Sequence, residues 1–268
     1  MNSRVVIVTG GTSGLGRAMA LALLDAGHRV AVVSRTKAAV DDFVEAAGGR
    51  RAGDRVLGVA GSVRSAEDCE RVVEMTISHF GSLDGLINNA GVHLPTTPDR
   101  VKFYELPIEQ WRSIVDTHLG GSFLMARAVS PRLIERGWGR IVNHVTNYDT
   151  MLRQGFTPYG AAKAALEAAT VGWSEELRGT GVTVNAILPG GVANVARIGA
   201  DVFPDRDKLV QPHVMGPPIV WLLSDASDDV TGYRFTARLW SAERPDAENL
   251  RIAASPAGWK GSPVAAQR

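Results

Sequence analysis

The chain has 268 residues, of which 45% are hydrophobic and 21% are charged, and its net charge at neutral pH is +1. This length and composition predict one large α/β domain with an ample core, and the balanced charge excludes a strong electrostatic attraction to nucleic acid or to an anionic membrane. The single cysteine, Cys69, excludes an internal disulfide, so the sequence is compatible with a reducing cytosol.

Short runs rich in β-branched residues alternate with longer helical patterns, which predicts a parallel sheet with helices on both faces. We expect about seven parallel strands, at residues 5–8, 29–33, 55–59, 85–88, 140–145, 182–188 and 234–237. We expect helices at residues 15–26, 36–47, 66–80, 108–135, 157–178 and 214–223. The connections are short and no repeat is visible, so the sequence predicts a doubly wound α/β fold in a single domain over residues 1–268.

Two segments depart from this alternation. Residues 190–213 form a long connection rich in glycine and proline, and loops of this length are often lids over a site. The tail at residues 240–268 has weak periodicity, and its apolar residues suit packing either on the domain or on another subunit.

The sequence contains no visible export or membrane segment. The first apolar run covers only residues 5–8, and no later run approaches the length that export or a bilayer span needs. We therefore expect a cytoplasmic protein without a membrane partner.

Tyr159 and Lys163 are four residues apart in an alanine-rich helical run. Positions i and i+4 of a helix lie on the same face, so the ammonium group is expected close to the phenol. A fixed cation favours the ionised phenol and makes it a usable acid-base group near neutral pH. Because Tyr-x-x-x-Lys also arises by chance in many helices, the pair needs support from the rest of the chain.

A glycine-rich turn follows the first predicted strand at once and opens the first predicted helix. In a doubly wound fold this turn presents backbone N–H groups and a helix N-terminus to a pyrophosphate. The sequence therefore predicts a dinucleotide site at Gly10, Thr12, Ser13, Gly14, Leu15 and Gly16.

The TGxxxGxG spacing of this turn, the Asn88-Asn89-Ala90-Gly91 run and the Tyr159/Lys163 pair occur together and in this order. In this combination the chain resembles the short-chain dehydrogenase/reductase family from about residue 5 to 195, and again near residues 221–225 and 230–232. The resemblance implies a Rossmann-type fold, hydride transfer between NAD(P)(H) and a ketone or secondary alcohol, and a homodimer or homotetramer with the helices predicted at 108–135 and 157–178 at the interface.

The resemblance also implies catalytic roles. Tyr159 would exchange the proton, Lys163 would bind the nicotinamide ribose and assist Tyr159, and Thr146 would hold the substrate oxygen where the family usually has serine. His118 stands where relatives often have an asparagine that holds a water molecule. It could hold the same water, bring its own titration near pH ~6.5, or be a structural histidine.

Further cofactor contacts follow from the same resemblance. Ser62 and Val63 take the place of a pair that contacts adenine, and Tyr159 and Lys163 join the cofactor set. The remaining positions are Asn89, Ala90, Gly91, Pro189, Gly190, Val192 and Asn194.

The end of the second predicted strand bears on the choice of cofactor. It reads Ser34-Arg35-Thr36, without the acidic residue that usually holds the ribose 2′-hydroxyl of NAD. Arg35 can pair with a 2′-phosphate through its planar guanidinium, and the two hydroxyls add donors. The sequence predicts a preference for NADP(H), with NAD(H) possible.

Two alternatives stay open, and the identity of the small carbonyl or alcohol substrate is not encoded in a motif. One alternative is a 3-oxoacyl-carrier-protein reductase, which would need a basic patch such as Arg132, Arg136 and Arg140 for its acidic partner. The other is a catalytically weak dinucleotide-binding regulatory protein. His93, His144, Asn147 and Tyr148 flank the expected cleft and could touch substrate. No metal is expected, because His93 and His144 have no third residue at metal-ligand spacing.

Overall fold

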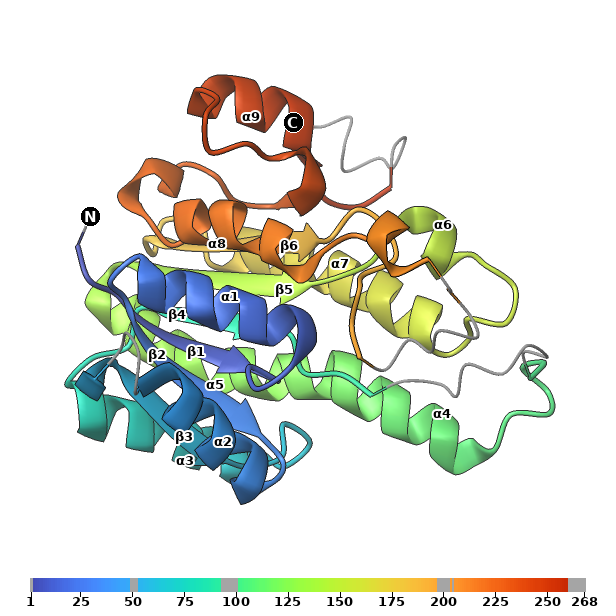
Figure 1. Ribbon diagram of the computed structural model, residues 1–268, viewed down its shortest axis with the longest axis horizontal. Coiled ribbons are helices and arrows are strands. Elements are labelled where there is room, and N and C mark those ends of the chain that lie inside the picture. The colour runs from blue at the N-terminus through green and yellow to red at the C-terminus, as the bar shows by residue number, and fades with distance from the viewer. Residues whose placement is uncertain (1, 49–52, 93–100, 197–202, 204, 260–268) are drawn as a thin grey trace.

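The computed structural model describes residues 2–48, 53–92, 101–196, 203 and 205–259, and in this part of the chain the strands form one eight-stranded sheet (Figure 1). The strand order is β3-β2-β1-β4-β5-β6-β7-β8. Strands β1 to β7 are parallel, and β8 pairs antiparallel with β7. The strands are β1 (Val5–Thr9), β2 (Arg29–Ser34), β3 (Val56–Ala60), β4 (Gly85–Asn88), β5 (Gly139–His144), β6 (Val182–Leu188), β7 (Tyr233–Thr236) and β8 (Ala254–Pro256).

Helices cover both faces of this sheet, which confirms the doubly wound, Rossmann-type arrangement (Figure 1). Buried side chains of α1, α2 and α8 share one apolar cluster with the sheet, and those of α3 and α5 share a second cluster on the opposite face. Every residue of β1 and β6 is buried, as expected for strands covered on both sides. The helices are α1 (Gly14–Asp25), α2 (Lys37–Ala47), α3 (Ala66–Phe80), α4 (Ile108–Val115), α5 (Gly121–Arg136), α6 (Tyr148–Met151), α7 (Tyr159–Glu176), α8 (Gly216–Leu222) and α9 (Asp246–Ala253).

The strand order reverses at β1, which lies between β2 and β4. Connections from neighbouring strands therefore leave in opposite directions at the carboxyl ends of β1 and β4. In doubly wound sheets this switch point opens the crevice where ligands bind. The glycine turn after β1 and the Asn89 segment after β4 both lie there.

The prediction of a single helix at residues 108–135 is wrong in one respect. The structure divides it into α4, a π-helical turn at Asp116–Gly120, and α5. Gly121 lies so close to Val63 that an added Cβ would be 2.5 Å from Cγ2 of that valine. Close packing of α5 on the loop after β3 thus requires glycine here, and the wider π turn carries His118.

The C-terminal tail is more ordered than its sequence indicates. Helix α9 and strand β8 follow β7, with Tyr233 opposite Pro256 and Phe235 opposite Ala254. Residues 260–268 of the predicted tail, and residues 197–202 and 204 of the predicted lid, lie outside the described residues. Within the segment predicted to be a lid, Ala193 forms a parallel bridge with Val210.

Candidate active site

The glycine turn has the backbone geometry that a phosphate site needs. Gly10 and Gly14 have positive φ values of 63° and 54°, which disfavour residues with a Cβ. A Cβ on Gly16 would lie 2.2 Å from the carbonyl oxygen of Gly10, so only glycine fits. Helix α1 begins at Gly14, has no acidic residue in its first turn, and is not capped by the Ser13 side chain. Its first N–H groups therefore suit an anion.

Asn89 joins this turn to the end of β4. Its side-chain Nδ2 donates to the carbonyl oxygens of Thr9 at 3.0 Å and Gly10 at 3.2 Å. The Thr9 hydroxyl in turn accepts from the backbone N–H groups of Asn89 and Ala90. These bonds hold the two sides of the crevice together, which gives Asn89 a structural role in shaping the turn.

Tyr159 and Lys163 lie in the first turns of α7, as their spacing predicts. Lys163 is 2% exposed, and its ammonium donates to the carbonyl oxygen of His144 at the end of β5. The Lys163 Nζ is 6.0 Å from the centroid of the Tyr159 ring. A buried cation thus lies beside a half-buried phenol.

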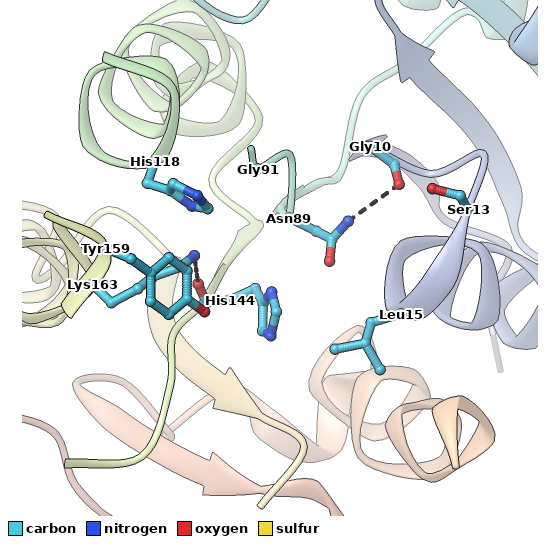
Figure 2. A pocket seen from close by; sticks show the side chains of 9 residues that line it. All are labelled: Gly10, Ser13, Leu15, Asn89, Gly91, His118, His144, Tyr159 and Lys163. Carbon is cyan, nitrogen blue, oxygen red and sulfur yellow. Dashed lines mark hydrogen bonds between the residues drawn. The ribbon is translucent and has the colours of Figure 1, made fainter. Parts of the chain in front are cut away.

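A single pocket joins the glycine turn to this pair. In Figure 2, Tyr159, Lys163, His118 and His144 lie on one side, Ser13 and Leu15 on the other, and Asn89 between them. The pocket is lined by Gly10, Ser13, Leu15, Asn89, Gly91, His118, His144, Tyr159 and Lys163. The glycine turn and the Tyr159/Lys163 pair, which are about 150 residues apart in the sequence, therefore line the same pocket.

His118 packs against Tyr159 from the π-helical turn. Its Nε2 is 2.8 Å from the carbonyl oxygen of Val92, and its ring lies edge-on to that of Tyr159. An added Cβ on Gly91 would be 2.4 Å from His118 Cε1, so the glycine leaves room for the imidazole. His118 thus lines the pocket, and its chemical role stays a prediction.

The family model of the short chain dehydrogenases matches residues 4–205 of the chain. The chain belongs to the short-chain dehydrogenase family. This short-chain dehydrogenase is an oxidoreductase, and members of the family use NAD(H) or NADP(H).

Individual relatives match over most of the chain. A 3-oxoacyl-[acyl-carrier-protein] reductase of Synechocystis sp. is 34% identical, covering 88% of this chain and 95% of the relative. An acetoacetyl-CoA reductase of Shinella zoogloeoides is 33% identical, covering 88% and 97%. The solved structure of the TT0495 protein from Thermus thermophilus superposes with a TM-score of 0.71 at 26% identity, covering 87% of this chain and 95% of that protein.

Several predicted residues of this short-chain dehydrogenase lie outside the pocket lining. Thr146 follows β5 by two residues, and its carbonyl oxygen accepts from Arg234 Nη2 at 3.0 Å. Ser34 ends β2, with Arg35 and Thr36 exposed beside it. The others that do not line the pocket in the described part of the chain are Thr12, Gly14, Gly16, Ser62, Val63, Ala90, Pro189, Gly190, Val192 and Asn194.

Local contacts explain three of these positions. Val63 packs against Gly121, and the Ser62 backbone N–H donates to Asp68 Oδ2 at 2.9 Å. The Asn194 side chain donates to Gln211 Oε1 at 2.9 Å. Their contacts with a cofactor remain predictions.

His144 is the pocket residue missing from the predicted catalytic and cofactor sets. The sequence places it only beside the expected cleft, from its position two residues before Thr146 at the carboxyl end of a strand. His93 lies outside the described residues. Within the described ranges no group of three His, Cys, Asp or Glu side chains could hold a metal, and no helix there is long and apolar enough to cross a membrane.

Proposed function

We propose that this short-chain dehydrogenase moves a hydride between NADP(H) and a ketone or secondary alcohol, with Tyr159 as the acid-base group. One observation carries the proposal: Tyr159 and Lys163 line the same pocket as Gly10 and Ser13 of the glycine turn. A proton-transfer pair beside a dinucleotide cradle is what this reaction requires.

The chain's residues fit a dinucleotide. The turn contains glycines at positions that have no room for a Cβ, and α1 begins within this turn. Backbone N–H groups near Ser13 and Leu15 would hold the pyrophosphate, and Lys163 would hold the nicotinamide ribose. The nicotinamide supplies the hydride chemistry when it is bound.

The proton transfer is carried out by the protein's own side chains. During reduction Tyr159 gives its hydroxyl proton to the carbonyl oxygen that becomes the alcohol, and during oxidation it takes that proton back. Lys163 stabilises the phenolate that remains, because its ammonium is buried next to the ring. The Thr146 hydroxyl donates a hydrogen bond to the same substrate oxygen and fixes its position.

Arg35 supports the preference for NADP(H). It is exposed directly after β2, and β2 ends in Ser34 rather than in an acidic residue. A guanidinium there can pair with a 2′-phosphate, and no carboxylate at the strand end repels it.

A 3-oxoacyl thioester is the substrate class that the relatives favour, since two of them are named for 3-oxoacyl-carrier-protein and acetoacetyl-CoA. The basic patch required by an acidic carrier protein is weak. Arg140 is 1% exposed and paired with Asp228, and Arg136 pairs with Asp84 at 2.6 Å. The surface therefore favours a small thioester or free ketone over the carrier-protein form.

We also propose a cytoplasmic homodimer or homotetramer built from one domain. Ile108 and Trp111 of α4 and Phe123 of α5 are 68%, 41% and 49% exposed, and burial of these large apolar side chains suits a subunit interface along the two helices. Light scattering coupled to gel filtration measures the mass. A monomer at micromolar concentration would contradict this part of the proposal.

The test of function is turnover with NADPH or NADH and a panel of ketones, diketones and acyl thioesters, followed by absorbance loss. Tyr159→Phe should lower kcat by at least about 100-fold while cofactor affinity stays similar. Tyr233→Phe, a half-buried tyrosine on β7, is the matched control and should keep full activity. Cofactor binding without turnover across the panel would favour the regulatory alternative.

A further inference from the structure

A buried ion pair joins α7 to β7. Glu167 follows Lys163 by one helical turn and is 0% exposed, and Arg234 on β7 is 7% exposed. The Arg234 Nε is 3.5 Å from Oε1 of Glu167. Buried charges are costly unless they are paired, so the two side chains depend on each other. Neither takes part in the proton transfer proposed above.

Arg234 also contacts the segment that follows β5. Its Nη2 donates to the carbonyl oxygen of Thr146 at 3.0 Å, and its Cζ lies 3.7 Å from the centroid of the Tyr148 ring. One rigid guanidinium thus binds the backbone of the second residue of this segment and stacks on the side chain of the fourth. The segment carries the hydroxyl that we assign to the substrate oxygen.

The C-terminal tail also contacts this cluster, at Glu167 and Tyr148. Strand β8 runs beside Arg234, which is opposite Ser255, and leads to Gly258. The Gly258 N–H donates to Glu167 Oε1 at 3.0 Å, and its carbonyl accepts from the Tyr148 hydroxyl. The same hydroxyl is 2.7 Å from Glu167 Oε1, so its proton serves one acceptor at a time.

Tyr148 acts as a donor at neutral pH. Burial, followed by the hydrogen bond to Glu167, raises the pKa of Tyr148 to about 12. Its hydroxyl therefore keeps its proton throughout the working pH range, and the tie between Glu167, Tyr148 and Gly258 persists.

We propose that Arg234 is a positioning residue of the active site: held by Glu167, which the tail contacts, it fixes the Thr146 carbonyl and so the Thr146 hydroxyl. This inference rests on the proposed function for its catalytic consequence, but the structural claim stands on the contacts alone. Through these contacts, the tail at β8 and Gly258 stabilises the segment that follows β5.

Arg234→Lys tests the claim with little loss of charge. A lysine has one nitrogen, so it cannot pair with Glu167 and also reach Thr146 as the guanidinium does. We expect kcat/KM for ketone reduction to fall about 10-fold, because small misplacements of a positioning group have effects of this size or larger. The Kd for NADPH should stay within about twofold, since the glycine turn is untouched.

A double-mutant cycle separates positioning from general damage. In a Thr146→Ala background Arg234→Lys should change kcat/KM by less than about twofold, because the hydroxyl that it positions is gone. Arg140→Lys is the matched control: Arg140 is also a buried arginine on the sheet, and it contacts Ser227 and Asp228. That control should lower the Tm without lowering kcat/KM.

A second measurement does not need turnover. The N–H groups of Thr150 and Leu152 donate to the carbonyls of Asn147 and Tyr148. Their hydrogen–deuterium exchange should be at least about threefold faster in Arg234→Lys than in the wild type, and unchanged in Arg140→Lys. If Arg234→Lys does not fold, the double variant Arg234→Gln/Glu167→Gln removes both buried charges and takes its place.

The two readouts fail differently. Losses in kcat/KM that add to those of Thr146→Ala, or exchange at residues 150–152 that matches the wild type, overturn the positioning role. Absence of turnover by the wild type overturns the proposed function instead, and the exchange measurement still decides whether Arg234 holds the loop.

Discussion

The imidazole of His118 stands edge-on to the phenol of Tyr159, with ring centroids 5.1 Å apart and ring planes at 85°. The imidazole is held from two further directions. Its Nε2 is 2.8 Å from the Val92 carbonyl oxygen, and it packs so closely on Gly91 that a Cβ at that position would not fit. Edge-to-face ring contacts of this kind are favourable and directional. The position of the Tyr159 ring is therefore linked to a glycine after β4.

Gly91→Ala should disturb this contact. An added Cβ would lie 2.4 Å from His118 Cε1, so the imidazole must move and the Tyr159 ring loses its support. We expect kcat/KM to fall about 10-fold in steady-state assays. In a His118→Ala background the same change should have little effect. If the loss persists there, Gly91 acts on the cofactor and not through His118.

Gly16→Ala should weaken cofactor binding. The new Cβ would be 2.2 Å from the Gly10 carbonyl oxygen and 2.3 Å from Asn89 Nδ2, so the glycine turn and its Asn89 brace must shift. We expect the Kd for NADPH, measured by fluorescence titration, to rise at least about 10-fold. Gly172→Ala on α7 meets nothing within 4 Å and is the control. An unchanged Kd in Gly16→Ala would show that the cofactor does not use this turn.

Strands and the glycine turn could be predicted because their signals are local. The expected ranges at 85–88 and 182–188 match β4 (Gly85–Asn88) and β6 (Val182–Leu188). Both are buried along their whole length, and β-branched or apolar residues within them mark their positions in the sequence. The Tyr159/Lys163 pair was recognisable for the same reason, since helical spacing alone places the two side chains together.

Tertiary features could not be read in this way. Strand β8 consists of Ala254, Ser255 and Pro256, which have no strand pattern, and it exists because β7 offers an edge to pair with. The contact between Arg234 and Thr146 joins residues 88 positions apart. No periodicity encodes such a contact, so the link between tail and active site emerges only from the fold.

His28 should make the protein less stable in acid. Burial, and then the positive charge of Arg4, lower the pKa of His28 from its ordinary value of 6.5. Its Nδ1 accepts from the Arg4 N–H at 3.1 Å, which requires the neutral ring. A lowered pKa contributes stability that is present above 6.5 and is lost as the pH falls through the folded-state value.

Thermal melts at about pH 7.5 and about pH 5.5 test this, with His28→Asn keeping a small acceptor at the site. The fall in Tm between the two pH values should be smaller in His28→Asn than in the wild type. His79→Asn changes an exposed histidine on α3 and should leave the fall unchanged. Equal falls in His28→Asn and the wild type would contradict the role given to His28.

Arg35→Asp should shift cofactor preference toward NADH. The substitution removes the guanidinium that can pair with a 2′-phosphate and puts a carboxylate next to Ser34, at the end of β2. A carboxylate repels the phosphate of NADPH and can accept from the ribose hydroxyls of NADH. We expect the ratio of kcat/KM for NADPH to that for NADH to fall at least about 100-fold. Arg178→Asp, which makes the same change of charge beyond the end of α7, should leave the ratio unaltered. A wild-type KM for NADH well below that for NADPH would contradict the assignment of Arg35, because NADH has no 2′-phosphate for the guanidinium to bind.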